Sequence, residues 1–266
     1  MLHLERQVQS MPEVRRKRKI VLCLVEGASD IDALSGPISK LYESIDESFE
    51  VKFLFAIDNR NKCGGDLTTR NGVSPSNIER LVYKLFVKDY LATDMLYPKD
   101  VYQIIQIIDT DGAYIPDENV VQTIRNAGDT QLPFYADGLI ETDCVQNIIE
   151  RNSQKRENLD KLVGLETIKV DRVPTKYSVY FFSCNIDHYL HNEANLHCAS
   201  KRQVAQCFSD TYKDNPSKFL EYLRDDTHDL KDASYQESWN YIRSNTNSTK
   251  RHTNLSIWLD SVTRVD

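Results

Sequence analysis

The feature that most constrains this chain is a short apolar run that ends in two aspartates. Residues 102–112 read Tyr-Gln-Ile-Ile-Gln-Ile-Ile-Asp-Thr-Asp-Gly. Four isoleucines in so short a run predict a buried β-strand rather than a helix. If the extended conformation persists, its two-residue period puts Asp109 and Asp111 on one side of the chain. Two carboxylates this close repel each other unless a proton or a cation lies between them, and a hard divalent cation such as Mg²⁺ suits that place.

Other strands and helices alternate along the chain. A helix after the first strand has Ser29 as a plausible N-cap, and Pro37 should bend or interrupt it. The alternation predicts an α/β fold with a mainly parallel sheet flanked by helices. We expect a catalytic domain over residues 1–198 and a helical C-terminal extension over 199–266. The other predicted strands cover residues 20–25, 49–57 and 177–184, and residues 134–140 form a short strand or hairpin arm. The later helices cover 78–90 and 142–162.

Acidic residues follow four of the predicted strands. They are Glu26, Asp58, the pair Asp109 and Asp111, and Asp187, for which the local pattern is looser. Ligands of parallel sheets bind beyond the carboxyl ends of the strands, so these carboxylates should meet at one edge. A pocket of carboxylates predicts a site for Mg²⁺ or Mn²⁺.

The charge of the chain permits only local binding of nucleic acid. The net charge of −7 over 266 residues argues against a generally basic coat protein. Two basic groups, one before the first strand and one in the polar segment 59–77, could contact phosphates, although such residues are equally often simply solvated. The candidates are Arg15, Arg16 and Arg18, and Arg60, Lys62 and Arg70.

Cysteine usage and hydropathy predict a cytoplasmic protein without a membrane segment. The first residues lack the apolar core of a signal peptide, and no run approaches membrane-spanning length. Six cysteines without a C-x-x-C pair are expected to be reduced thiols. A weaker possibility is zinc, because five residues of zinc-ligand type lie close together in the sequence, although their spacing matches no established finger. These are Cys184, His188, His191, His197 and Cys198.

Two motifs together resemble a known family. Residues 24–30, Leu-Val-Glu-Gly-Ala-Ser-Asp, are followed about eighty residues later by Ile-Ile-Asp-Thr-Asp-Gly at 107–112. This pattern resembles the Toprim domain of topoisomerases, primases and related nucleases. An acidic residue stands four positions after Glu26, at Asp30. This spacing resembles the nuclease branch of the family, typified by the overcoming-lysogenization-defect family. The compact size resembles stand-alone Toprim effectors of bacterial antiphage systems, such as the PARIS-type nuclease. The resemblance covers roughly residues 19–190.

The resemblance implies a role for each matching residue. Glu26 would be a metal ligand or general base, and Asp109 and Asp111 would be metal ligands. Asp30 would be an accessory ligand, and Asp187 would be a further ligand. The implied activity is Mg²⁺- or Mn²⁺-dependent endonucleolytic cleavage of DNA or RNA, including tRNA, by a toxic defence effector. The implied partners are a second copy of the chain and a regulatory protein such as an ATPase sensor, docked on the C-terminal extension. A lysine that assists some family members has no identifiable counterpart here, and Lys62 is the candidate.

Two alternatives stay open. A phosphatase of the haloacid dehalogenase type also carries Asp-x-Asp-Gly after a strand, but normally after the first strand and with a downstream acidic pair, for which Asp225 and Asp226 are candidates. A non-catalytic protein that keeps a Toprim shell would use the aromatic C-terminal region to bind a partner. Topoisomerase activity is not expected, because none of the fourteen tyrosines lies in a recognisable context.

Overall fold

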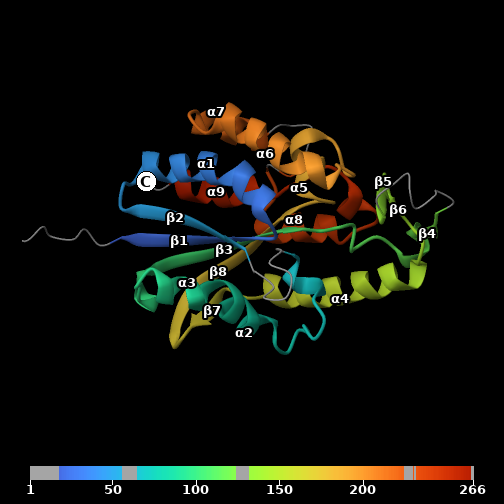
Figure 1. Ribbon diagram of the computed structural model, residues 1–266, viewed down its shortest axis with the longest axis horizontal. Helices are drawn as coiled ribbons and strands as arrows, with labels where there is room; N and C mark the ends of the chain where they lie inside the picture. The colour runs from blue at the N-terminus through green and yellow to red at the C-terminus, as the bar shows by residue number, and fades with distance from the viewer. Residues whose placement is uncertain (1–17, 56–64, 124–131, 225–229, 231, 265–266) are drawn as a thin grey trace, which may run out of the picture.

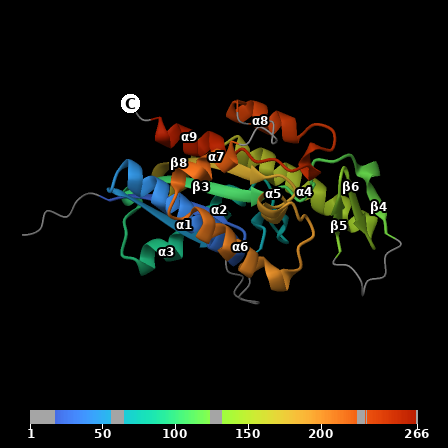
Figure 2. The same ribbon diagram turned by 90° about the horizontal axis from the view of Figure 1, so that it is seen from above.

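The computed structural model describes residues 18–55, 65–123, 132–224, 230 and 232–264. Within them, helices cover both faces of a central sheet (Figures 1 and 2). The predicted α/β class is therefore confirmed. In the part of the chain that is described, no helix is long and apolar enough to cross a membrane.

The central sheet has five strands in the described residues, in the order β2-β1-β3-β8-β7. All neighbours pair in parallel except β7, which runs antiparallel to β8 at one edge. A mainly parallel sheet is thus also confirmed. The strands are β1 Lys19–Val25, β2 Phe49–Phe55, β3 Val101–Asp109, β7 Thr167–Val170 and β8 Val173–Phe182. A second sheet of order β4-β6-β5 contains β4 Val120–Gln122, β5 Phe134–Ala136 and β6 Leu139–Thr142.

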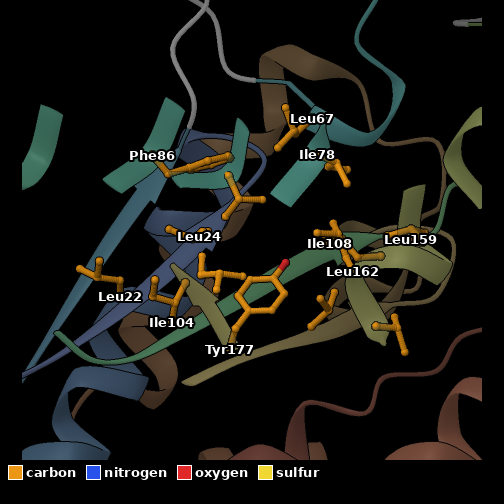
Figure 3. Close-up of a cluster of buried hydrophobic side chains, with 14 of the residues drawn as sticks. Leu22, Leu24, Leu67, Ile78, Phe86, Ile104, Ile108, Leu159, Leu162 and Tyr177 are labelled. Carbon is orange, nitrogen blue, oxygen red and sulfur yellow. The ribbon is translucent and has the colours of Figure 1, made fainter. Parts of the chain in front are cut away.

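The two-residue period of the strands divides the core between the two faces of the sheet. Leu22 and Leu24 of β1 point into one hydrophobic cluster, together with Ile104 and Ile108 of β3 (Figure 3). The alternate residues, Ile105 among them, point into the other. The first face is covered by α2 Ile78–Val82, the π-helical η2 Tyr83–Val87, α3 Lys88–Thr93, α4 Val145–Val163 and α8 Tyr235–Ile242. The second is covered by α1 Ala28–Ile45, α5 Ile186–His191, α6 Cys198–Tyr212, α7 Pro216–Leu223 and α9 Leu255–Thr263.

The strand order places a topological switch point between β1 and β3. From β1 the chain passes through α1 to β2 on one side, whereas from β3 it passes through α4 to β8 on the other. The connections after the two adjacent strands therefore diverge at their carboxyl ends. This is where open α/β sheets bind ligands.

Three local predictions need correction. The N-cap of α1 is Gly27 rather than Ser29, and the Asp30 side chain accepts a hydrogen bond from the Gly27 N–H. Pro37 does not interrupt α1, because buried residues on both sides of it, Leu34 and Ile38, pack the helix onto the sheet. The long helix α4 begins at Val145, since Thr142 still belongs to β6.

The C-terminal residues share the hydrophobic core of the sheet. The boundary expected at residue 198 falls at the first residue of α6, which packs on α1. Trp239 and Trp258 are fully buried, and the Trp258 indole donates a hydrogen bond to the Tyr42 hydroxyl at 3.1 Å. These aromatic side chains stabilise the fold, so they are not free to form the partner-binding surface for which the sequence suggested them.

Candidate active site

Glu26 is presented by the turn between β1 and α1. It follows the last residue of β1, and Asp30 lies in the first turn of the helix. Asp30 Oδ2 accepts hydrogen bonds from the backbone N–H groups of Glu26 (3.1 Å) and Gly27 (2.9 Å). Burial raises the pKa of Asp30 to about 6, although these backbone bonds oppose the shift. In this structure Asp30 therefore holds the turn that positions Glu26.

Asp109 and Asp111 reach the same place through a strand end and a turn. Asp109 is the last residue of β3, and Asp111 has a φ of 48° in the left-handed region. The extended conformation thus does not persist to Asp111, and the expected side-by-side arrangement on a strand is wrong. Instead, the turn is tied to the end of β8 because the Asp111 N–H donates to the Cys184 carbonyl at 2.7 Å. Asp109 Oδ1 accepts from the Ile186 N–H at 2.9 Å.

The three predicted carboxylates converge. The Asp109 N–H donates to Glu26 Oε1 at 3.1 Å, which joins the ends of β1 and β3. Glu26, Asp109 and Asp111 line one cavity of about 260 Å³. Its other polar side chains are Tyr135, Asn185, Asn195 and Lys201. The convergence of carboxylates predicted from strand ends is therefore present at the switch point.

A buried lysine that was not among the predicted site residues completes the cluster. Lys155 of α4 is fully buried, and its ammonium lies 2.6 Å from Asp111 Oδ2 and 2.9 Å from Asp66 Oδ2. Glu26 Oε1 is 3.9 Å away from the same nitrogen. These carboxylates hold the pKa of Lys155 well above its ordinary value against the effect of burial, so the lysine stays charged. It also keeps the pKa of Asp111 low, although burial alone would raise it.

Helical spacing contained a weak indication of Lys155. The residues of α4 that face the sheet include Ile148, Asn152, Lys155, Leu159 and Leu162, at intervals of three or four. A lysine on an otherwise apolar and amide-bearing stripe is buried only when it is paired. However, the sequence does not show which carboxylates lie opposite the stripe, because this depends on the strand order.

An arginine one turn earlier on α4 fixes the wall of the cavity. Arg151 donates to the Asp111 carbonyl at 2.9 Å and to the Tyr135 hydroxyl at 3.0 Å. The backbone of Tyr135 in β5 is also held by the side-chain amide of Asn195, whose Oδ1 accepts from the Tyr135 N–H at 2.8 Å and whose Nδ2 donates to the Tyr135 carbonyl at 2.7 Å. Asp111 and the tyrosine ring are thereby set in fixed positions relative to each other.

Asp187 is buried beside the cavity but does not line it. Its carboxylate lies 2.7 Å from Lys201 Nζ of α6, and it is Lys201 that reaches the cavity. The residue predicted as a fourth metal ligand thus pairs with a lysine that lines the cavity.

The predicted nucleic-acid contacts are only partly placed. Arg18 pairs with Glu50 at 3.1 Å. It directly precedes β1 and therefore lies at the amino ends of the strands, whereas Glu26 lies at their carboxyl ends. Arg70 follows the short helix η1 Leu67–Thr69 and donates to the Gly65 carbonyl at 3.3 Å. The other predicted contacts, Arg15, Arg16, Arg60 and Lys62, and the acidic residue Asp58 lie outside the described residues.

The oxygen donors at the switch point suit a hard divalent cation. Burial, together with the neighbouring carboxylates, raises the pKa of Glu26 and Asp109 well above their ordinary values, although Lys155 opposes the shift. The lysine therefore neutralises only part of the negative charge, and Mg²⁺ or Mn²⁺ prefers such carboxylates. Asp109 would hold the ion, with Asp111 shared between it and Lys155, and Glu26 would be either a further ligand or the general base.

The fit is nevertheless not that of a preformed site. Among the described residues, no three His, Cys, Asp or Glu side chains lie in the arrangement of a metal centre. This holds for the five residues proposed for zinc, from Cys184 to Cys198, all of which are described. Asp225 and Asp226, the acidic pair that a phosphatase would require, lie outside the described residues.

Comparison with known proteins assigns no family to the chain. No protein-family model, no curated protein and no solved structure matches it.

Mg²⁺ is expected to stabilise the fold more at a pH of about 8 than at about 5. Because the pKa of Asp30, Glu26 and Asp109 is raised by folding, the folded state binds more protons than the unfolded state above a pH of about 4. Stability without metal should then fall as the pH rises through this window, whereas bound protons compete with the metal at low pH. Thermal unfolding with Mg²⁺ and with EDTA measures the difference. An equal stabilisation by Mg²⁺ at both pH values, or a stabilisation that persists in Asp109→Asn, would contradict a cation site at these carboxylates.

Proposed function

We propose that this protein is a Toprim-like, Mg²⁺- or Mn²⁺-dependent nuclease that hydrolyses phosphodiester bonds in nucleic acid. The observation that carries the proposal is the convergence of Glu26, Asp109 and Asp111 on one cavity at the switch point between β1 and β3. A cation held there would lower the pKa of a bound water and offset negative charge on the attacked phosphate.

The chain's own residues have separate tasks in this reaction. Glu26 is suited to accept a proton, since burial raises the pKa of its carboxyl well above the ordinary value. Lys155 fixes the direction of the Asp111 carboxylate. Lys201, although paired with Asp187, lines the cavity and can donate a hydrogen bond to a phosphodiester oxygen.

Cleavage of a diester, as opposed to a monoester, is the direct test. The purified protein should cleave single-stranded or duplex DNA, RNA or tRNA in Mg²⁺ or Mn²⁺ and lose this activity in EDTA. Bis(p-nitrophenyl) phosphate and p-nitrophenyl phosphate serve as matched small diester and monoester probes. Hydrolysis of the monoester alone would favour a phosphatase. Binding of nucleic acid without cleavage of any probe would favour a non-catalytic shell.

The resemblance adds a biological proposal. The cleavage would be toxic to the producing cell and restrained by a partner such as an ATPase sensor, in an antiphage system. Self-association of the chain belongs to the same proposal and is measured by light scattering of the purified protein.

A further inference from the structure

A second cavity adjoins the carboxylate site. Its volume is about 280 Å³, and Tyr135 and Ala194 line both cavities. The rest of its wall comes from β5, α5 and the segment after the short helix η6 Asn247–Thr249, with Asp137, His188, Lys250 and Arg251 as its charged or ionisable side chains. We call it the basic pocket.

The two cations of the basic pocket are not neutralised by described carboxylates. Neither Lys250 nor Arg251 forms an ion pair within the described residues. Arg251 is held in place by neutral groups, because it donates to the Tyr189 carbonyl at 2.8 Å and to the Tyr222 hydroxyl at 3.1 Å. Lys250 is exposed. Asp137 is the acidic member, so the formal charge of the pocket is +1 with a neutral histidine.

His188 supplies an independent indication of a polar ligand. Its Nδ1 atom is buried, and within the described residues it has no hydrogen-bond partner. Burial and the nearby Arg251 lower the pKa of His188 to about 4, so the ring is neutral at neutral pH. A neutral imidazole that carries its proton on Nδ1 can donate to an anionic oxygen. Buried polar atoms without partners are uncommon in native proteins, and a bound ligand is one explanation for them.

The position of the pocket indicates what the anion belongs to. A chain of net charge −7 with a carboxylate-lined cavity repels phosphates unless cations lie nearby. A polynucleotide carries successive phosphates, so one strand can place a phosphate in each of two adjoining cavities. Tyr135, fixed by Arg151 and Asn195, forms the shared wall.

We propose that the basic pocket binds a non-scissile backbone phosphate of the substrate strand, with Lys250, Arg251 and His188 as its donors. This inference rests on the proposed nuclease function and deepens it. It gives the C-terminal segment a task in binding the substrate: Lys250 and Arg251 are positioning residues that set the strand across the carboxylate site. Contacts of this kind fix register without reading sequence.

Lys250→Ala is the principal test, because the side chain is exposed and its loss is expected to leave the fold intact. Binding of fluorescent single-stranded DNA and RNA oligonucleotides is measured by anisotropy in a Glu26→Gln background, so that binding is separated from cleavage. We expect about a tenfold loss of affinity for all sequences, and a decrease of about one in the slope of log K against log salt. In the otherwise wild-type enzyme, KM should rise while kcat changes little. Lys250→Arg should restore both.

Lys218 of α7 provides the matched control. It is exposed, away from both cavities, and Lys218→Ala removes the same charge. An equal loss of affinity in Lys250→Ala and Lys218→Ala would show that only the net charge of the protein matters. That result would overturn the proposal that the basic pocket binds a phosphate. Unchanged affinity and salt slope in Lys250→Ala, in a protein that cleaves, would overturn the inference and leave the nuclease proposal standing. Wild-type protein that neither binds nor cleaves the oligonucleotides would overturn both.

Discussion

Replacing Glu26 by glutamine is expected to lower the rate of nucleic-acid cleavage by about 10²–10⁴-fold, the range of a lost general base. Glutamine keeps the shape of the side chain, and its carbonyl can still accept the hydrogen bond from the Asp109 N–H. What it loses is the negative charge and the capacity to take a proton. Single-turnover cleavage in Mg²⁺ measures the effect.

Measuring the thermal stability of Glu26→Gln shows whether a loss of cleavage comes from lost chemistry or from unfolding. Because burial raises the pKa of Glu26, its charge is disfavoured in the folded state, and neutral glutamine removes that penalty. The thermal midpoint of Glu26→Gln in EDTA should therefore not fall. Stabilisation by Mg²⁺ should decrease at the same time.

Glu43 is the matched control for Glu26. It lies exposed on α1 and forms a surface ion pair with Lys40 at 3.2 Å. Glu43→Gln should leave cleavage unchanged, since such pairs contribute little. Toxicity on expression in bacteria gives a second readout, with growth arrest expected for wild type and Glu43→Gln but not for Glu26→Gln. Equal cleavage and equal toxicity in the two variants would remove the catalytic proposal.

The strands and the acidic residues that follow them were predictable because local physics determines them. Apolar β-branched residues in β1 and β3 indicate buried parallel strands, and the carboxyl ends of parallel strands meet at one edge. The positions of Glu26 and Asp109 in the site follow from these two facts alone. Asp111 reaches the cavity by a left-handed turn that the Asp-x-Asp-Gly spacing does not specify.

Residues whose position depends on the packing of distant elements were not predictable. Lys155 becomes buried against Asp66 and Asp111 because α4 crosses beneath the switch point, which depends on the strand order. Lys250 joins the site only because the segment after η6 returns to the end of β8. Helical periodicity identifies a buried face, but it does not identify what that face meets.

Lys155→Met is expected to destabilise the protein by about 3–5 kcal/mol, the range for removing one partner of a buried ionic cluster. Methionine fills a similar volume but leaves the carboxylates of Asp111 and Asp66 without the ammonium that lay 2.6 and 2.9 Å from them. Lys155 itself is fully buried, so solvent does not screen the loss. Equilibrium unfolding in urea measures the free energy. Mg²⁺ should stabilise Lys155→Met more than wild type, because a divalent cation can replace the missing positive charge among the same oxygens.

Two further variants determine whether charge is the cause. Lys161→Met changes an exposed lysine of the same helix and should alter stability by less than about 1 kcal/mol. In Asp111→Asn/Lys155→Met the carboxylate closest to the lysine is neutral as well, so the double variant should be more stable than Lys155→Met alone. If the double variant is less stable than the single one, the penalty lies in packing rather than in unpaired charge. The carboxylates would then tolerate one another without the lysine, and the electrostatic basis for a cation between Glu26, Asp109 and Asp111 would be lost.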